Sequence, residues 1–470
     1  MGATDPHAGE QSTAPRVRIA GAGDAGQRGA ARPNPGTRSG RSPTAFRGRE
    51  WGILGMLTLV YTVNIIDRQV MGILSQQVQR DLNLTDAQLG LLGGLAFAAL
   101  YSVLAIPLAV VADRTGLTRM IAGSLALWSV FTGLCGLATT YPMLLLARLG
   151  VGVGEAGGAA PSYALISAHF PPERRGKATG VFTLAIPLGA AMGALFGGWI
   201  AHAFSWRAVF IVLGAVGLVL APFFRRVVPE PPTGNAETAH SVQGSLLLAT
   251  WSRLARMPAF WLIAFGTATA SMTNYGLQFW LPALMQRSFG LSLLQTSWFT
   301  GALLLLGGLA GTFGGGALAD RFGKTDKAAY ARVPALGFIL SSPLYAVGIL
   351  SGDWRIAFAL FLIPQAFTFS WFAPVLTATQ QLVGAHMRAT ASASLLLIVN
   401  LIGIGAGPWL LGAVSGWLRP VVGHDALRYA LLSGLSLYVF GGVLLWIGGR
   451  HLRQPPATGG RMAHLAERRG

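Results

Sequence analysis

The chain has 470 residues, of which 52% are hydrophobic and only 11% are charged. A soluble domain carries about 25% charged residues, so this composition predicts a membrane protein with several spans and argues against a globular enzyme. One cysteine, Cys135, lies in an apolar run, so we expect no disulfide framework, no metal site and no cofactor.

Residues 1–48 are rich in Gly, Ala, Pro, Ser and Arg and hold no apolar core, which predicts a disordered basic tail. Apolar runs follow, each as long as the roughly 20 residues that a span needs, or longer. They predict an all-α membrane protein with twelve transmembrane helices near 51–75, 87–112, 119–139, 141–168, 176–202, 207–225, 258–286, 293–318, 331–351, 354–382, 388–417 and 427–449. A polar, proline-containing linker over 227–257 separates two six-helix bundles, 49–226 and 258–450, and a tail occupies 451–470.

The basic residues are divided unequally between the two sides of this predicted topology. The formal charge is +18, which in a soluble protein would suggest a nucleic-acid partner. Here fourteen bases lie in or beside the loops on the side of the two termini, against six on the other side. This bias predicts both termini in the cytoplasm and a place in the inner (plasma) membrane. We expect a monomer with no nucleic-acid partner.

The two bundles carry matching segments. Asp113 and Asp320 lie 207 residues apart in similar Ala-Asp-Arg sequences, and Arg175 and Arg388 lie 213 apart. Matches at nearly one offset indicate two related halves. In transporters with such repeats, the substrate site lies between the halves, near the middle of the membrane.

Two acids, Asp67 and Glu155, lie within apolar runs, whereas the other fifteen acids fall in predicted tails or loops. A charged group in hydrocarbon costs roughly 2.5–3.5 kcal/mol on insertion scales, so both are candidate functional residues. Each has an arginine nearby in the sequence: Arg68 follows Asp67, and Arg148 lies seven residues before Glu155. Two acids and two bases in one half suggest a proton-coupled transport site.

Helix periodicity relates these residues to one another. Arg148 and Glu155 share a face of the fourth helix, two turns or about 10 Å apart. If the first and fourth helices both face a central cavity, Asp67 reaches Arg148, and Glu155 lies apart from any basic residue. Burial favours the protonated form of a carboxyl group and a nearby arginine favours its charged form, so such an acid can change protonation during transport. The alternative for each acid is a fixed structural ion pair, and the direction of Arg68 is left open.

The predicted helices of the second half contain no acid, and their deeper polar groups are neutral. A charged half that faces an aromatic, uncharged half predicts a cavity for an amphipathic molecule. The alternative is that the aromatic residues face lipid or pack between helices. The candidate substrate-binding residues are Arg148, Arg68, Asn64, Tyr61, Asn274, Gln278 and Trp371.

The segment Gly316-x-x-x-Asp320-Arg321-x-Gly323-Lys324 resembles the cytoplasmic loop signature of the major facilitator superfamily. The first copy departs from it, since Ala109 replaces the leading glycine and Leu117 the base. The acids of these loops can accept hydrogen bonds from helix N-terminal N–H groups or pair with an arginine of the opposite half. A contact made in one state only would bias alternating access. The candidate gate residues are Asp113, Arg114, Arg119, Asp320, Arg321, Lys324, Arg175 and Arg388.

A narrower resemblance rests mainly on residues 60–235. Asn64-Ile-Ile-Asp67-Arg68, Arg148-x-Gly-x-Gly-x-Gly154-Glu155-Ala156 and Ile186-Pro187-Leu-Gly189 are similar to segments of the spinster-like lipid transporters, bacterial homologues included. Trp206-Arg207 and Glu230-Pro231 fit the same pattern. An Asp-Arg pair in the first helix also occurs in organic-anion symporters of the superfamily.

We therefore expect a proton-coupled secondary transporter of an amphipathic lipid, such as a lysophospholipid or a sphingosine-phosphate-like molecule, with protons and membrane lipids as its other partners. One alternative is a proton-coupled symporter of a small organic anion. Another is a membrane-embedded enzyme that modifies lipids, against which stands the absence of a His or Cys constellation, of HExxH and of a Gly-x-Ser-x-Gly elbow. A channel or receptor fits poorly with repeated halves and buried acids.

Overall fold

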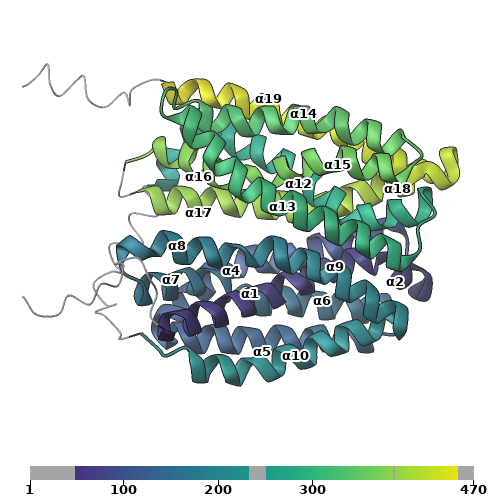
Figure 1. Cartoon of the computed structure of the whole chain (residues 1–470), viewed down its shortest axis with the longest axis horizontal. Coiled ribbons are helices and arrows are strands. Elements are labelled where there is room, and N and C mark those ends of the chain that lie inside the picture. Colours follow the sequence, from purple (N-terminus) through teal and green to yellow (C-terminus); the bar gives the residue numbers. More distant parts are fainter. Residues whose placement is uncertain (1–47, 232–249, 385–386, 454–470) are drawn as a thin grey trace, which may run out of the picture. The chain divides into compact units, whose positions relative to one another are not determined.

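The computed structural model describes residues 48–231, 250–384 and 387–453, and these residues form helices and short connections (Figure 1). The predicted tail, apart from residue 48, lies outside the described residues, as do most of the linker and most of the C-terminal tail. Two ends of the helical assembly are distinguished below. The terminal end is where the first described helix begins and the last one ends, and the opposite end is the other.

The predicted helices of the N-terminal half are present, and four of the six are interrupted. The first is α1 (Gly48–Ile73) followed by α2 (Ser75–Leu82), the second is α3 (Asp86–Gly93) and α4 (Leu95–Thr115), and the third is α5 (Leu117–Leu137). The fourth is α6 (Tyr141–Glu155) and α7 (Ala159–His169), the fifth is α8 (Pro172–Thr183) and α9 (Ala185–Ala203), and the sixth is α10 (Trp206–Val227).

The C-terminal half repeats this order. It consists of α12 (Pro258–Ser288), α13 (Leu293–Gly323), α14 (Ala329–Leu350), α15 (Trp354–Ser370), α16 (Phe372–Gln381), α17 (Arg388–Val399), the π-helix η2 (Asn400–Ala406), α18 (Gly407–Val422), the 3₁₀ turn η3 (Gly423–Asp425), α19 (Ala426–Arg450) and the turn η4 (His451–Arg453). The predicted tenth helix is thus interrupted at Trp371, and the eleventh contains the π-helix.

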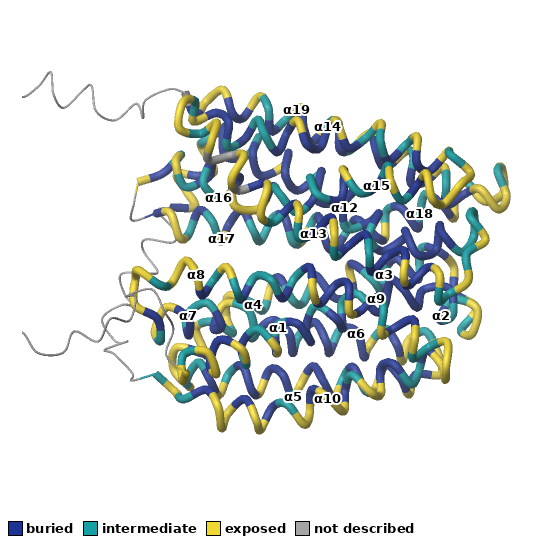
Figure 2. Tube along the Cα trace, in the orientation of Figure 1, coloured by how far each residue is buried: buried dark blue, intermediate teal, exposed yellow. Residues whose placement is uncertain are grey.

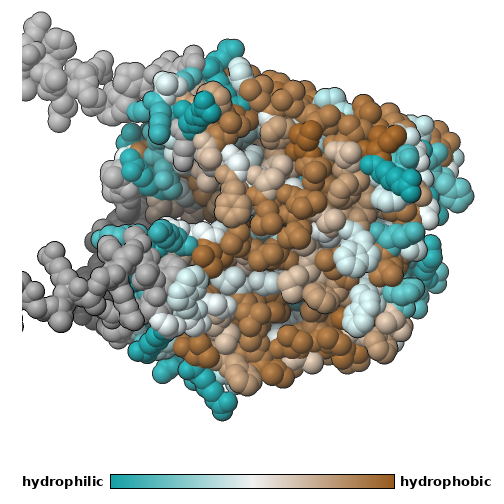
Figure 3. Space-filling view, viewed as in Figure 1, coloured by the Kyte–Doolittle hydropathy of each residue, from teal (hydrophilic) through white to brown (hydrophobic). Residues whose placement is uncertain are grey.

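Nine stretches of the described chain are long and apolar enough to cross a membrane, and one of them, 388–450, holds both the eleventh and the twelfth predicted helices. α1 and α12, with 26 and 31 residues, are not among the nine. Each begins its half and carries polar side chains toward the interior. Apolar side chains cover the middle of the face seen in Figure 3, and hydrophilic ones lie toward its two ends. Such a band matches the hydrocarbon core of a bilayer.

Burial follows the position of each helix in the assembly. α1 and α12 contact each other and are buried over much of their length, whereas exposed positions recur along the outer helices α5 and α10 (Figure 2). α5 packs against α10 in the first half, and α12 packs against α19 in the second.

The two halves also meet where α9 packs against α13, α3 against α18, and α4 against η2. Two glycines permit the close approach of the second and eleventh helices. A Cβ atom on Gly90 would lie 2.3 Å from the carbonyl oxygen of Pro408, and one on Gly94 would lie 2.6 Å from that of Gly405. Backbone thus packs against backbone across the interface, toward the opposite end.

Candidate functional site

Asp67 of α1 and Arg148 of α6 form a fully enclosed ion pair. Their Oδ1 and Nη1 atoms are 3.5 Å apart, and each side chain is 2% exposed. Thr132 of α5 donates a hydrogen bond to the other carboxylate oxygen, and Arg148 Nε donates to the carbonyl oxygen of Leu92, 3.5 Å away. The predicted contact between Asp67 and Arg148 is therefore present, and both carboxylate oxygens have a partner.

Glu155 pairs with Arg68, contrary to the expectation that it stands apart from any base. Arg68 Nε lies 2.7 Å from Glu155 Oε2. Glu155 is completely buried, whereas the Arg68 side chain is 23% exposed. The second oxygen, Oε1, has no hydrogen-bond partner among the described residues. Because Arg68 is one residue beyond Asp67 on α1, it projects about 100° around the helix and reaches a different part of α6.

Aromatic rings lie against both arginines. The guanidinium carbon of Arg68 lies 4.8 Å from the ring centroid of Phe97 and 4.5 Å from that of Tyr101, both on α4. The two rings stack with centroids 5.2 Å apart. The guanidinium carbon of Arg148 lies 5.6 Å from the centroid of Phe97. All three are cation–π contacts, which become stronger away from water.

The other five candidate substrate-binding residues are more scattered. Tyr61 stacks on Phe182 with centroids 4.7 Å apart, and Asn64 is buried on α1. On α12, Gln278 Nε2 donates to Asn274 Oδ1 at 3.1 Å. Trp371 is buried at the break between α15 and α16. Within the described chain, no hydrogen bond or ring contact joins the last three to the four charged residues.

A second charged cluster lies at the opposite end and joins the two halves. Arg287, near the end of α12, donates to both carboxylate oxygens of Asp86 at 2.8 and 3.0 Å, and also to Gln76 and Gln79 of α2. Ser415 of α18 donates to Asp86 at 2.7 Å. The placement of Asp86 in a loop was wrong, since it begins α3 and is 3% exposed.

One signal in the sequence could have located this acid. Thr85 and Gln88 form a capping box, in which Thr85 Oγ1 accepts from the Gln88 N–H and Gln88 Oε1 accepts from the Thr85 N–H. A Thr-x-x-Gln pattern before an apolar run predicts that the helix starts at the next residue. That prediction places Asp86 in the first helical turn.

Comparison with known proteins agrees with this architecture. The family described as the Major Facilitator Superfamily matches residues 57–408. The chain belongs to this superfamily. A solved bacterial homologue of the human lysosomal transporter Spinster, inward-facing and unoccupied, superimposes with a TM-score of 0.77 at 26% identity and covers 88% of this chain and 100% of its own. The predicted spinster-like major facilitator fold is confirmed.

Two relatives are transporters of different kinds. An MFS-type efflux pump from Mycolicibacterium smegmatis is 32% identical over 417 residues, which are 86% of this chain and 94% of the relative. A hexuronate transporter from Bacillus subtilis is 26% identical over 399 residues, 82% of this chain and 92% of the relative. The chain is therefore an integral membrane transporter.

The superfamily loop at the terminal end uses a different acid from the one expected. Glu230, which follows α10, accepts from the backbone N–H groups of Thr118 and Arg119 at 3.2 and 3.3 Å. It therefore caps the N-terminus of α5, where a negative charge is favourable. Gly116 (φ +105°) makes room, since a Cβ there would lie 2.7 Å from the Glu230 carboxyl carbon. Asp113 of the loop is exposed and does not provide this cap.

None of the remaining gate candidates whose side chains are described forms a hydrogen bond or ion pair with the other half. Arg175 Nε donates to the carbonyl oxygen of Phe170 at 2.9 Å, which is local to the α7–α8 connection. The side chain of Asp320 lies outside the described residues. The other candidates are exposed at the terminal end: Arg114, Arg119, Arg321, Lys324 and Arg388. Their gating role stays a prediction.

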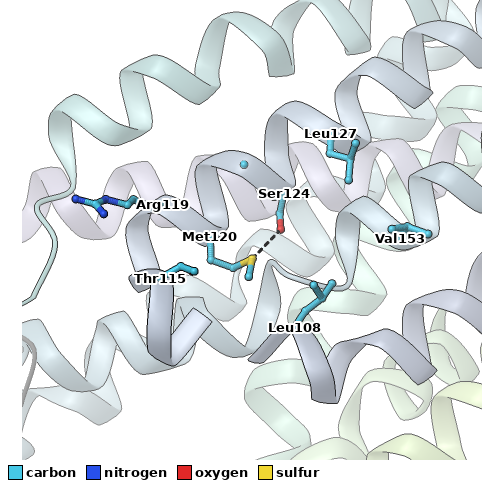
Figure 4. Close-up of a pocket in the computed structure, with 8 residues that line it drawn as sticks. Leu108, Thr115, Arg119, Met120, Ser124, Leu127 and Val153 are labelled. Carbon is cyan, nitrogen blue, oxygen red and sulfur yellow. Dashed lines mark hydrogen bonds between the residues drawn. The ribbon is translucent and has the colours of Figure 1, made fainter. Parts of the chain in front are cut away.

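A cavity of about 330 Å³ lies between α4, α5 and α6 (Figure 4). Its lining is mostly apolar, with Arg119 toward one side and the Ser124 hydroxyl near the Met120 sulfur at 3.8 Å. None of the four charged residues of the buried site lines it. The cavity is therefore separate from the candidate transport site.

Proposed function

We propose that the chain is a proton-coupled secondary transporter of an amphipathic lipid that works by alternating access. The observation that carries this proposal is the contrast between the two ion pairs. Asp67 and Arg148 are both enclosed and both carboxylate oxygens are satisfied. Arg68 is partly exposed, and its acid, Glu155, keeps one oxygen without a partner. The second pair is the one that a proton and a substrate can separate.

Coupling follows from competition for Arg68. A proton that binds at Oε1 of Glu155 removes the negative charge, and Arg68 then lacks its counterion. A phosphate or carboxylate of the substrate headgroup replaces it, because the arginine fork suits both groups. Loss of the proton restores the Arg68–Glu155 pair and expels the headgroup. In this scheme one proton accompanies each bound headgroup.

Asp67 is the second proton-coupling candidate, and its pairing with Arg148 is testable separately. Removal of one partner of a buried ion pair leaves an uncompensated charge and costs about 3–5 kcal/mol. Asp67→Asn and Arg148→Ala should each impair transport, and the double variant should be less impaired than the sum of the two. Strict additivity in a double-mutant cycle would show that the pair is not coupled.

A lipid is supported by the distribution of polar and aromatic groups. The charged cluster lies in the first half, and the described spans of the second half contribute neutral groups such as Asn274 and Gln278 together with Trp371. The likeness to a Spinster homologue supports the same class. The excess of bases in loops at the terminal end supports a topology in which both termini are cytoplasmic, in the inner (plasma) membrane.

The test is uptake of oleoyl-lysophosphatidylglycerol into proteoliposomes under an imposed pH gradient. Glu155→Gln mimics the protonated acid, so we expect lipid uptake by this variant to become independent of the pH gradient. Glu173→Gln, an exposed acid of α8, is the matched control and should behave as the natural chain. An unchanged pH dependence in Glu155→Gln would remove Glu155 from the coupling role.

A small organic anion is the second candidate substrate, because two arginines line the site and a hexuronate transporter is among the relatives. Thermal stability in nanodiscs separates the two, since a ligand that binds the folded state raises Tm. We expect the lysophospholipid to raise Tm and its headgroup alone to raise it little. The headgroup alone lacks the acyl chain, whose burial contributes roughly 0.8 kcal/mol per methylene. If galacturonate stabilises the protein and is taken up while the lipid is not, the lipid assignment fails.

A further inference from the structure

Phe97 occupies a special place in the charged cluster, because both guanidinium groups lie against its ring. The ring centroid is 4.8 Å from the Arg68 guanidinium carbon and 5.6 Å from that of Arg148. The residue is 1% exposed. Its side chain carries no hydrogen-bonding group, so it can stabilise the cations only through its π face and by excluding water.

The backbone is arranged to bring this ring close to both arginines. α4 begins at Leu95, after the break at Gly94, and Phe97 is its third residue. On α6, Gly152 lies between Arg148 and Glu155, and a Cβ atom there would be 2.6 Å from the Phe97 carbonyl oxygen. A side chain at position 152 would push α4 away from the cluster. The glycine therefore sets the distance at which Phe97 meets both arginines.

We propose that Phe97 is a positioning residue that holds the two arginines on one aromatic surface, so that each acid keeps its own base. This inference rests on the proposed proton coupling. The charged groups that act on Glu155 are Arg68 and Asp67 of α1 and Arg148 of α6. Without the ring, the two pairs merge into one network, and a proton on Glu155 no longer frees Arg68 alone.

The ring also explains how Arg68 stays in place once Glu155 is protonated. An arginine that loses its counterion in a dry site turns toward another acid or toward water. The stacked rings of Phe97 and Tyr101 give the Arg68 guanidinium group cation–π contacts that do not depend on the proton. Arg68 thus remains available for an anionic headgroup.

Fluorination of the ring tests this directly. Replacement of Phe97 by mono-, tri- and pentafluorophenylalanine progressively removes the negative potential of the ring face with little change in volume. A cation–π contact of ordinary strength predicts that the affinity for oleoyl-lysophosphatidylglycerol in nanodiscs falls in a graded manner, by about threefold to thirtyfold for the pentafluoro form. An affinity that is flat across the series would overturn the proposal. Phe224, fully buried on α10, is the control and should show no trend.

A readout without substrate keeps this result separate from the proposed transport function. In spectra of nitrogen-15-labelled arginine, the side-chain signals of Arg68 and Arg148 should carry ring-current shifts from Phe97. Phe97→Leu should remove the shift of Arg148 and reduce that of Arg68, which also lies over Tyr101. In Glu155→Gln the shift of Arg68 should persist, since the ring still holds it. If Glu155→Gln alone releases Arg68 from the ring, Phe97 does not hold it and the proposal is wrong, whichever substrate the transporter carries.

Discussion

Asp86→Asn should release the contact between the two halves at the opposite end. Asp86 accepts four hydrogen bonds at 2.7–3.0 Å, two from Arg287, one from Gln79 and one from Ser415. An asparagine keeps the shape but has one acceptor oxygen, and its NH₂ group faces donors. Arg287 and Ser415 belong to the other half, so the cost falls on the interface rather than on the packing within either half.

The size of the effect follows from burial. Removal of one partner from a buried ion pair costs about 3–5 kcal/mol. Asp86 is 3% exposed, whereas the Arg287 side chain is 22% exposed. The arginine therefore regains some hydration when its partner is lost, and we expect Asp86→Asn to cost about 2–3 kcal/mol. At 1.36 kcal/mol per tenfold change, the equilibrium shifts by about 30-fold to 150-fold toward forms in which this end is open.

Spin labels across this end measure that shift. Phe204 in the first half and Val421 in the second are 77% and 82% exposed, and both can be changed to cysteine. Cys135 is the single cysteine and is buried, so replacing it by alanine leaves a clean background. Pulsed electron spin resonance in nanodiscs should show a longer distance component that grows in Asp86→Asn.

The control is another acid at the same end whose partner lies in its own half. Asp81 pairs with Arg207, and both belong to the first half. Asp81→Asn should leave the distance distribution unchanged. If Asp86→Asn also leaves it unchanged, or if both variants shift it equally, the Asp86 cluster does not hold the two halves together.

Two further variants test close contacts described above. Gly152→Ala should lower Tm, because forcing a methyl group into contact with the Phe97 carbonyl costs about 1–3 kcal/mol. Gly123→Ala is the control, since nothing lies within 4 Å of the added atom. Equal Tm values for the two variants would refute the packing argument. Glu230→Ala should lower the free energy of unfolding, measured by chemical denaturation in detergent, by about 0.5–2 kcal/mol, because it removes the cap of α5. Glu230→Gln should recover part of this loss. No loss in either variant would show that the cap contributes nothing.

The sequence predicts the helices and the enclosed ion pair because both follow from the cost of polar groups in hydrocarbon. Long apolar runs must be helical there, and Asp67 and Arg148 are each too costly to remain unpaired. The pairing of Arg68 with Glu155 was missed for a geometric reason. Periodicity gives the direction in which Arg68 leaves α1, but not how far its flexible side chain extends toward the neighbouring helix.

Contacts between remote segments were the least predictable. Asp86 and Arg287 are 201 residues apart and lie near helix ends, where charged residues are common and most need no partner. Glu230 reaches Thr118 across 112 residues, so nothing local in the loop indicates that this acid rather than Asp113 caps α5. Such pairings depend on how the helices assemble, which single-residue properties do not encode.

The order in which the chain is made has a consequence for α1. Asp67 and Arg68 emerge first, and their partners follow 81 and 87 residues later. At a synthesis rate of about 5–20 residues per second, roughly 4–17 seconds pass before the partners on α6 can pair with the two charges of α1. Over that interval it carries two uncompensated charges, each costing roughly 2.5–3.5 kcal/mol at the centre of a bilayer. α1 therefore needs shelter at the insertion machinery until the fourth helix arrives, and a nascent chain that stops before Asp86, where the next apolar span begins, should remain extractable from the membrane by alkali.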